Sequence, residues 1–233
     1  MKKKTSHPVY FAGERAGFAR LLGHAGLAEA VYEKSHGKYL CRLPQDFAPR
    51  GRHPRLVRDH HLRTLLECDA GLFCLDDAGP DDGTAADFMF AKFADLPAVV
   101  LCDAATGSGP RRAPRGRLTD FFPRTVTLGL DSLHAYRALQ RRRARGRRAA
   151  LDEVVRLAGQ HASATAAVLC DQVATAVVRA LDKVIAEEPA MPRHLREEIY
   201  NWLALMPGLR GKEKALRKEL ERLLAAKVKK GLL

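Results

Sequence analysis

The stretch Ala70-Gly71-Leu72-Phe73-Cys74-Leu75 is a continuous apolar run with the length of a β-strand. A run that is this short and this apolar is typical of a strand that is buried on both faces. Two further runs have the same character, Val9-Tyr10-Phe11-Ala12 and Ala98-Val99-Val100-Leu101-Cys102, and a shorter fourth run covers residues 38–43. The first half of the chain is therefore predicted to contain a sheet.

Helical patterns separate these strands. Apolar residues recur at helical spacing over residues 14–30, 55–68 and 85–94. Because strands that alternate with helices favour a parallel sheet covered on both faces, we expect an α/β domain. In such sheets ligands bind beside the loops that follow the carboxyl ends of the strands. The loops after Phe11, Leu43 and Leu75 are therefore the expected location of a site.

The rest of the chain is expected to be mostly helical. A Gly-, Pro-, Ser- and Arg-rich loop at 104–117 precedes a short element around 124–128 and a helix at 132–143. Apolar residues keep helical spacing over 151–185, and two shorter amphipathic helices are expected at 192–205 and 212–229. The long helix has an apolar stripe that must pack against something. The sequence leaves three partners open for it: the two later helices, the first domain, or a second copy of the chain.

Three regions follow from these patterns. We predict an α/β domain over residues 1–140, an Arg-rich linker over 141–150 and a helical C-terminal region over 151–233. The formal net charge is +13, and nearly half of this excess lies in the linker, which contains six arginines and no acidic residue. The linker has neither interleaved aromatics nor a groove-reading motif, so we expect it to be solvated and do not expect nucleic-acid binding. A basic protein that binds DNA or RNA through Arg141 to Arg148 stays open as an alternative.

Cysteine spacing and hydropathy bear on the cellular location. The five cysteines show neither CxxC nor Cys/His zinc spacing, so they are expected to be reduced and structural, as in a cytoplasmic protein. The basic start at residues 1–4 is not followed by the apolar segment of a signal peptide. No uninterrupted apolar run approaches the roughly 20 residues that cross a bilayer. We therefore expect neither secretion nor a membrane span, and no metal site.

Taken in order, several segments resemble the nucleoside 2-deoxyribosyltransferase family. Val9-Tyr10-Phe11-Ala12-Gly13 is similar to its opening strand and substrate loop, and residues 59–101 resemble its second half. That half contains the acidic loop Asp81-Asp82-Gly83-Thr84-Ala85-Ala86-Asp87 and the strand entry Leu96-Pro97. The resemblance implies a Rossmann- or flavodoxin-like parallel sheet with helices on both faces, followed here by an all-α C-terminal region. It also implies a nucleoside or nucleotide substrate, a homo-oligomer and no cofactor.

The resemblance assigns roles to individual residues. Asp87 matches the family's nucleophilic glutamate, and we expect it at the start of a helix, where backbone amides stabilise an anion. Asp81 matches the aspartate that contacts the base, and Tyr10 matches a tyrosine placed near the nucleophile. Phe11 and Gly13 would form the wall and the close-approach backbone of the pocket.

The family's reaction explains why it needs two carboxyl groups. Cleavage of the bond between a sugar's anomeric carbon and a base nitrogen builds oxocarbenium character, which a carboxylate beneath the ring traps as an ester. The departing base needs a proton at its nitrogen, and a second carboxyl group supplies it. A second base, or water, then attacks the ester.

This sequence departs from the family pattern at several positions. Asp87 is one methylene shorter than glutamate, and a shortfall of about 1 Å at a reacting atom costs on the order of a hundredfold in rate. Met89 replaces a glycine, and His61 stands where the family has a sugar-binding aspartate. Asp59 and Gly83 complete the expected substrate-binding set.

These departures leave three functions open. The first is deoxyribosyl transfer between bases. The second is a nucleoside 5′-monophosphate N-glycosidase, in which water replaces the acceptor base and His61 meets the phosphate. The third is a catalytically inactive nucleotide-binding module.

Overall fold

The computed structural model describes residues 6–14, 17–47, 54–75, 82–103, 121–144, 160–205 and 213–233. Its centre is one parallel sheet with the order β2-β1-β3-β4-β5. The strands are β1 (His7–Ala12), β2 (Tyr39–Arg42), β3 (Ala70–Cys74), β4 (Ala98–Asp103) and β5 (Thr125–Leu130). This is the strand order of flavodoxin-like folds. The predicted α/β fold with a parallel sheet is confirmed, and the short element predicted around 124–128 is the fifth strand.

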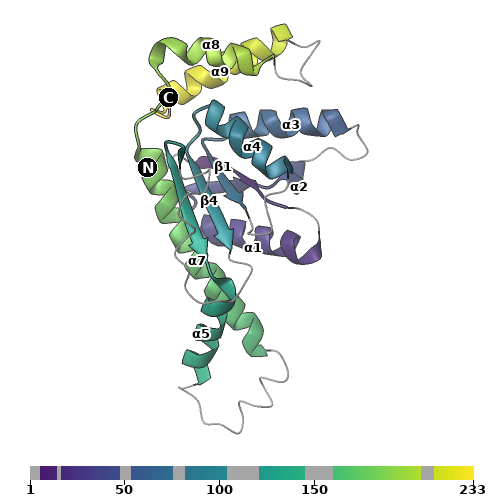
Figure 1. Ribbon diagram of the computed structural model, residues 1–233, viewed down its shortest axis with the longest axis vertical. Helices are drawn as coiled ribbons and strands as arrows, with labels where there is room; N and C mark the ends of the chain where they lie inside the picture. Colours follow the sequence, from purple (N-terminus) through teal and green to yellow (C-terminus); the bar gives the residue numbers. More distant parts are fainter. Residues whose placement is uncertain are drawn as a thin grey trace.

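The helices surround this sheet (Figure 1). They are α1 (Phe18–Lys34), α2 (Pro44–Phe47), α3 (Pro54–Glu67), α4 (Asp82–Phe93), α5 (Ser132–Ala144), α7 (Gln160–Ala186), α8 (Arg196–Leu203, after a 3₁₀ turn at Arg193–Leu195) and α9 (Glu213–Lys229). The predicted helix at 14–30 begins later, at Phe18, because Gly17 has a φ of 104°, which a helix does not accommodate.

One face of the sheet is covered by α1 and α7. Strand residues that point to this side, including Val9, Phe11 and Leu72, pack with Val31 of α1 and Leu181 of α7. Figure 1 shows α7 running along the sheet beside β4 and continuing beyond it next to α5. The apolar stripe of the long helix is therefore covered by the sheet and α1. Sequence alone had left this choice open.

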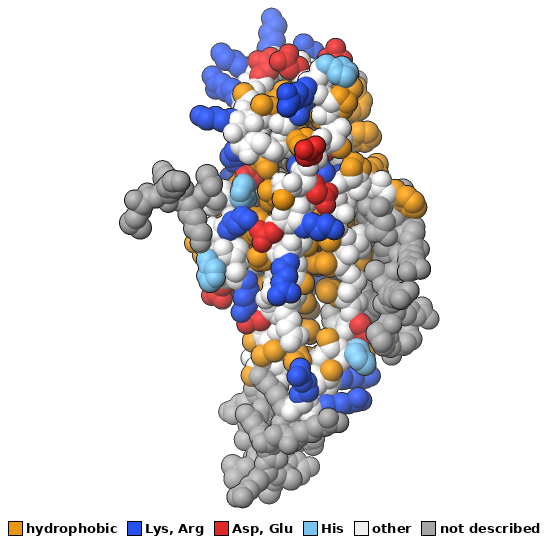
Figure 2. Space-filling model, turned by 90° about the vertical axis from the view of Figure 1, so that its left-hand side faces the viewer, with side chains coloured by type: hydrophobic (Ala, Val, Ile, Leu, Met, Phe, Trp, Pro, Cys, Tyr) orange, Lys and Arg blue, Asp and Glu red, His pale blue; other side chains and the backbone are white. Residues whose placement is uncertain are grey.

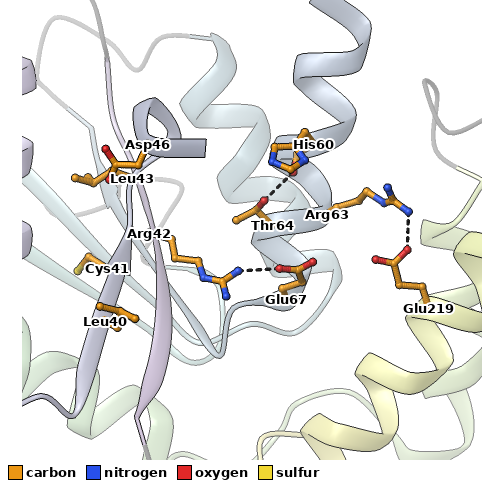
Figure 3. A pocket seen from close by; sticks show the side chains of 10 residues that line it. All are labelled: Leu40, Cys41, Arg42, Leu43, Asp46, His60, Arg63, Thr64, Glu67 and Glu219. Carbon is orange, nitrogen blue, oxygen red and sulfur yellow. Dashed lines mark hydrogen bonds and ion pairs between the residues drawn. The ribbon is translucent and has the colours of Figure 1, made fainter. Parts of the chain in front are cut away.

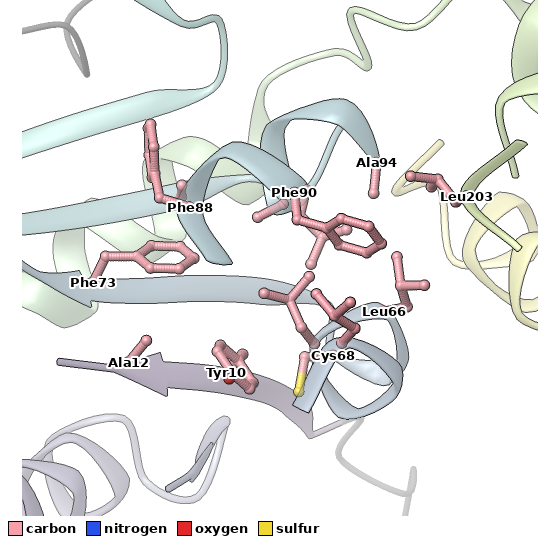
Figure 4. Close-up of a cluster of buried hydrophobic side chains, with 14 of the residues drawn as sticks. Tyr10, Ala12, Leu66, Cys68, Phe73, Phe88, Phe90, Ala94 and Leu203 are labelled. Carbon is pink, nitrogen blue, oxygen red and sulfur yellow. The ribbon is translucent and has the colours of Figure 1, made fainter. Parts of the chain in front are cut away.

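The opposite face is covered by α3 and α4, with α8 and α9 stacked on them as a further layer (Figure 1). The close-up in Figure 4 shows Tyr10 and Phe73 of the sheet, Phe88 and Phe90 of α4, and Leu203 of α8 in one cluster. The rings of Phe73 and Phe88 meet edge to face with centroids 5.4 Å apart, the arrangement that aromatic quadrupoles favour. The C-terminal helices thus pack on both sides of the sheet, and the predicted division into domains stays a prediction.

Among the described residues, one helix is long and apolar enough to span a bilayer on length and composition alone. This segment is Ala162–Ala186 of α7, in which a window of 18 residues has a mean hydropathy of 1.4 and is 28% buried. Two carboxylates of α7 form ion pairs with lysines at the end of α1 and just after it. Asp171 accepts from Lys34, the last residue of α1, at 2.7 Å, and Asp182 accepts from Lys38, which precedes β2, at 2.5 Å. These contacts, like the apolar stripe, hold α7 against the α/β core.

The last helix docks at the amino ends of β1 and β3 through a charged cluster. Lys227 is 4% exposed and donates to the backbone carbonyl of Cys68. Lys230 and His7 both contact the Asp69 carboxylate at 2.9 Å. Burial raises the pKa of Asp69, but the hydrogen bonds from His7 and Lys230 outweigh it and lower the pKa below its usual range. Burial lowers the pKa of Lys227 to about 8.

The packing of α7 predicts a large loss of stability for Leu181→Ala. Leu181 is fully buried against the sheet, so its truncation should lower the free energy of unfolding by about 2–5 kcal/mol. Urea unfolding followed by circular dichroism measures the change. The matched substitution Arg179→Ala, at an exposed position of α7, should stay within about 0.5 kcal/mol. Equal effects of the two substitutions would contradict burial of this stripe.

The burial of Lys227 predicts a pH dependence. The pKa of Lys227 is about 8 in the folded chain and 10.5 in the unfolded chain. Between these two pKa values the unfolded state binds more protons than the folded state, so the free energy of unfolding rises with pH. From pH 7 to pH 9.5 the free energy of unfolding of the wild type should therefore rise by about 1–2 kcal/mol relative to that of Lys227→Met. Subtracting the profile of the variant removes the contributions of the other titrating groups. Parallel stability profiles for the two proteins would show that Lys227 carries no such shift.

Candidate functional site

A buried hydrogen bond joins the first strand to the fourth helix. The Tyr10 hydroxyl donates to Oδ2 of Asp87 over 2.9 Å, across 77 positions of sequence. Tyr10 points to this side because side chains alternate along β1: Tyr10 and Ala12 enter the cluster below α3 and α4, whereas Val9 and Phe11 face α1 and α7. The predicted proximity of Tyr10 and Asp87 is thus present in the structure.

Asp87 points inward because of its position on α4. The buried residues of this helix include Thr84, Phe88 and Ala91, which share one face with Asp87 at helical spacing. However, α4 begins at Asp82, so Asp87 lies in its second turn and the expected location at the helix start is wrong. Asp82 is an acidic residue in the first turn, which favours an earlier start, and the Gly83-Thr84 pair belongs to that turn. The first-turn amides are therefore further from the carboxylate than expected.

Arg58 is the cation nearest to this carboxylate among the ion pairs of the described residues. Its Nη2 lies 3.8 Å from Oδ1 of Asp87, and its side chain is 40% exposed, whereas that of Asp87 is 9% exposed. Arg58 was not among the residues predicted from the sequence. A signal was present, because Arg58 lies four and seven positions before Leu62 and Leu65, which pack in the same cluster as Tyr10.

The position of this contact within the fold is the one where parallel sheets bind ligands. In the order β2-β1-β3-β4-β5 the direction of chain progression reverses between β1 and β3, and the crevice beyond their carboxyl ends is the topological switch point. Tyr10 lies on β1, and α4, which carries Asp87, is the helix that follows β3. The two side chains therefore flank the expected ligand position.

Phe11 and Gly13 are not brought to the same face as Asp87. Phe11 is 1% exposed and stacks at 5.0 Å from the ring of His24, on the α1 side of the sheet, so its side chain does not form a wall beside the carboxylate. Gly13 does make a close approach, because an added Cβ would lie 2.7 Å from the His24 ring and 3.1 Å from Cβ of Cys74. That close approach is to the protein's own side chains.

The remaining predicted residues lie around α3 and α4. His61 is 4% exposed and lies one turn beyond Arg58, on the side of α3 that packs toward α4. Asp59 is half-buried on the same helix, and Gly83 is half-buried in the first turn of α4. Asp81 lies outside the described residues. The roles assigned to these residues stay predictions.

A hollow of about 450 Å³ lies on the other side of α3 (Figure 3). Its lining includes Leu40 of β2 and Leu43, which follows β2. Two ion pairs lie in the lining: Arg42 with Glu67 at 2.7 Å, and Arg63 with Glu219 of α9 at 2.5 Å. The α3 residues that line it point away from the face that carries Arg58, so the hollow is separate from the Asp87 carboxylate.

In the described part of the chain, histidine, cysteine and acidic side chains bear on two other kinds of site, a metal centre and a reactive thiol. No group of three or more His, Cys, Asp or Glu side chains is arranged there to hold a metal ion. None of the five cysteines forms a disulfide. Burial raises the pKa of the Cys41 and Cys68 thiols to about 12, so neither is a thiolate at neutral pH.

No family model and no curated protein matches the chain. A solved structure of a 2-deoxyribosyltransferase from the psychrotolerant bacterium Bacillus psychrosaccharolyticus is similar, with 16% sequence identity and a TM-score of 0.39 over 51% of this chain and 84% of that chain. A likeness at this level bears on neither activity nor substrate, and membership of the family stays a prediction.

The Tyr10–Asp87 contact predicts a measurable energetic coupling. Hydrogen bonds to charged groups contribute about 1.5–3 kcal/mol, so a double-mutant cycle of Tyr10→Phe and Asp87→Ala should give a coupling of this size in urea unfolding. Tyr32→Phe removes a hydroxyl from a half-exposed tyrosine of α1 and should change stability by less than about 0.5 kcal/mol. Additive effects in the cycle would show that the two side chains do not interact.

Proposed function

We propose that this chain is an enzyme that cleaves the N-glycosidic bond of a nucleoside or nucleotide and passes the sugar to an acceptor through an ester on Asp87. The observation that carries the proposal is the 2.9 Å hydrogen bond between the Tyr10 hydroxyl and the Asp87 carboxylate, buried beside the β1–β3 switch point. A carboxylate is costly to bury unless donors satisfy it. Its retention at the ligand-binding edge supports a chemical use.

The geometry supports Asp87 as the nucleophile. Tyr10 fixes the direction of one carboxylate oxygen, and the other faces the Arg58 guanidinium at 3.8 Å. A carboxylate whose rotamer is fixed in this way loses little freedom when it attacks, which is how positioning lowers a barrier. Tyr10 also supplies a donor to the carboxylate when it departs from the sugar in the second step.

The reaction is a double displacement. In the first step an Asp87 oxygen bonds to the anomeric carbon while the carbon–nitrogen bond breaks, and the electron pair leaves with the base nitrogen, which takes a proton from an acid group. In the second step an acceptor nitrogen or water attacks the same carbon, the carboxylate is released and the acceptor's proton returns to that group. Two inversions retain the configuration. Asp81 is the proposed acid, and no cofactor enters either step.

The position of Arg58 supports a second candidate function, in which the substrate carries a phosphate. Its guanidinium is partly exposed next to the carboxylate and can form paired hydrogen bonds with a phosphate. A 5′-monophosphate would then be held by Arg58, with His61 of the same helix beside it. Hydrolysis of a deoxynucleoside 5′-monophosphate is therefore proposed as the alternative activity. A cytoplasmic homo-oligomer belongs to the same proposal.

The activity is tested by base release. Purified protein is incubated with deoxynucleosides and with their 5′-monophosphates, with and without a free acceptor base, and products are separated by liquid chromatography. Asp87→Ala should abolish release, and Tyr10→Phe should lower the rate by at least about tenfold, because the carboxylate loses its orienting donor. Asp46→Asn removes the same charge at the separate hollow and should keep full activity.

Each result assigns one function. An exchanged nucleoside in the presence of acceptor base supports transfer, whereas free sugar or sugar phosphate without exchange supports hydrolysis. Activity that survives Asp87→Ala would refute the nucleophile. If the wild type binds nucleotides but releases no base from any of them, the enzyme proposal fails and a nucleotide-binding module remains.

A further inference from the structure

Helix α5 begins at the same edge of the sheet as the candidate site. It follows β5, whose carboxyl end lies at the edge formed by the carboxyl ends of the other parallel strands. The helix start is held by two side chains: the Ser132 amide donates to Asp103 of β4 at 3.1 Å, and the His134 amide donates to Asp131 at 3.0 Å. From there α5 runs away from the sheet, packed beside the end of α7 (Figure 1).

The outer face of α5 carries exposed cations that pair with no acidic residue among those the structure describes. His134, Arg137, Gln140 and Arg141 share one side at helical spacing and are exposed, and Arg142 is exposed next to them. No described carboxylate forms an ion pair with any of the three arginines. The exposed lysines beside α7 differ, since Lys34 and Lys38 are paired with aspartates.

The sequence of α5 and of the residues that follow it carries charge of one sign. Residues 132–151 contain seven arginines and no Asp or Glu. Figure 2 shows acidic and basic side chains mixed over the middle of the molecule, with Lys and Arg side chains also at its upper end and just above the grey atoms in its lower part. Among the described side chains, Arg137, Arg141 and Arg142 give the exposed part of α5 a positive charge.

We propose that the outer face of α5 binds the phosphodiester backbone of a nucleic-acid duplex. Guanidinium groups form paired hydrogen bonds with phosphate oxygens, which makes arginine better suited than lysine to this contact. Arg137 and Arg141 lie one turn apart on the same side of the helix, so both guanidinium groups can face one strand. Binding of this kind needs no base readout.

The packing of α5 argues against a membrane surface as the partner. A helix that binds a bilayer needs a free apolar face to insert. The apolar side of α5, which includes Tyr136 and Leu139, is half-buried where α5 packs on α7. Within the part of α5 that the structure describes, the exposed side carries one apolar side chain, Leu133, among its arginines, which is less than an inserting face needs. The sequence alone had favoured a solvated linker, and the exposure of Arg137, Arg141 and Arg142 on one formed helix changes that inference.

The test is the salt dependence of binding to a fluorescein-labelled 20-base-pair DNA duplex, measured by fluorescence anisotropy. The full-length protein is compared with the triple variant Arg137→Gln, Arg141→Gln, Arg142→Gln. The slope of the logarithm of the binding constant against the logarithm of the salt concentration should fall by about one unit per arginine removed. The substituted side chains are exposed, and circular dichroism checks that the variant is folded.

A matched control removes three exposed cations elsewhere. Lys214, Lys218 and Arg222 form a row on α9, at the opposite end of the molecule (Figure 1), and their replacement by Gln changes the net charge equally. This control should keep the wild-type slope. Equal salt-dependence slopes for the two triple variants would overturn the proposal, because binding to the duplex would then depend only on the total charge of the protein. Arginine-dependent binding to phosphatidylserine–phosphatidylcholine vesicles without binding to the duplex would overturn it as well.

Discussion

The structure depends on the burial of both faces of its parallel sheet. A parallel strand such as β3 carries apolar side chains on each side, so each face needs a layer of helices before it is stable in water. The α1 and α3 helices, together with α4, cover part of this surface, and α7 completes the cover along β4 and β5. The helical second half of the chain is thus part of the cover of the sheet.

The same constraint positions the candidate site. Alternation along β1 sends Tyr10 to the α4 side, and the inward face of α4 carries Asp87 to meet it. The hydrogen bond forms where two apolar layers close on each other, so both polar groups are held in one arrangement by the packing around them. Arg58 reaches the carboxylate from the more exposed side. Tyr10 orients one oxygen of the carboxylate and Arg58 faces the other, and Asp87 as a whole is 6% exposed.

Much of the fold could be predicted because apolar periodicity reports burial directly. The strands at Val9, Ala70 and Ala98 and the helices between them follow from it. The site was less predictable. The Tyr10–Asp87 pair came from a family resemblance, whereas Arg58 was missed because a charged residue in an amphipathic pattern is ordinarily solvent-facing. The location of Asp87 in the second turn of α4 was also missed, since glycine at position 83 suggested a turn where the helix had already begun.

Sequence by itself determined which segments become strands and helices, since each segment's pattern of apolar residues and its turn formers depend only on neighbours in the chain. Tertiary structure alone decided what the α7 stripe packs on and which face of the sheet each side chain joins. It also decided that Phe11 lies in a different layer from Tyr10. The physical reason is that these outcomes are set by packing between residues far apart in sequence, such as the 77 positions that separate Tyr10 from Asp87.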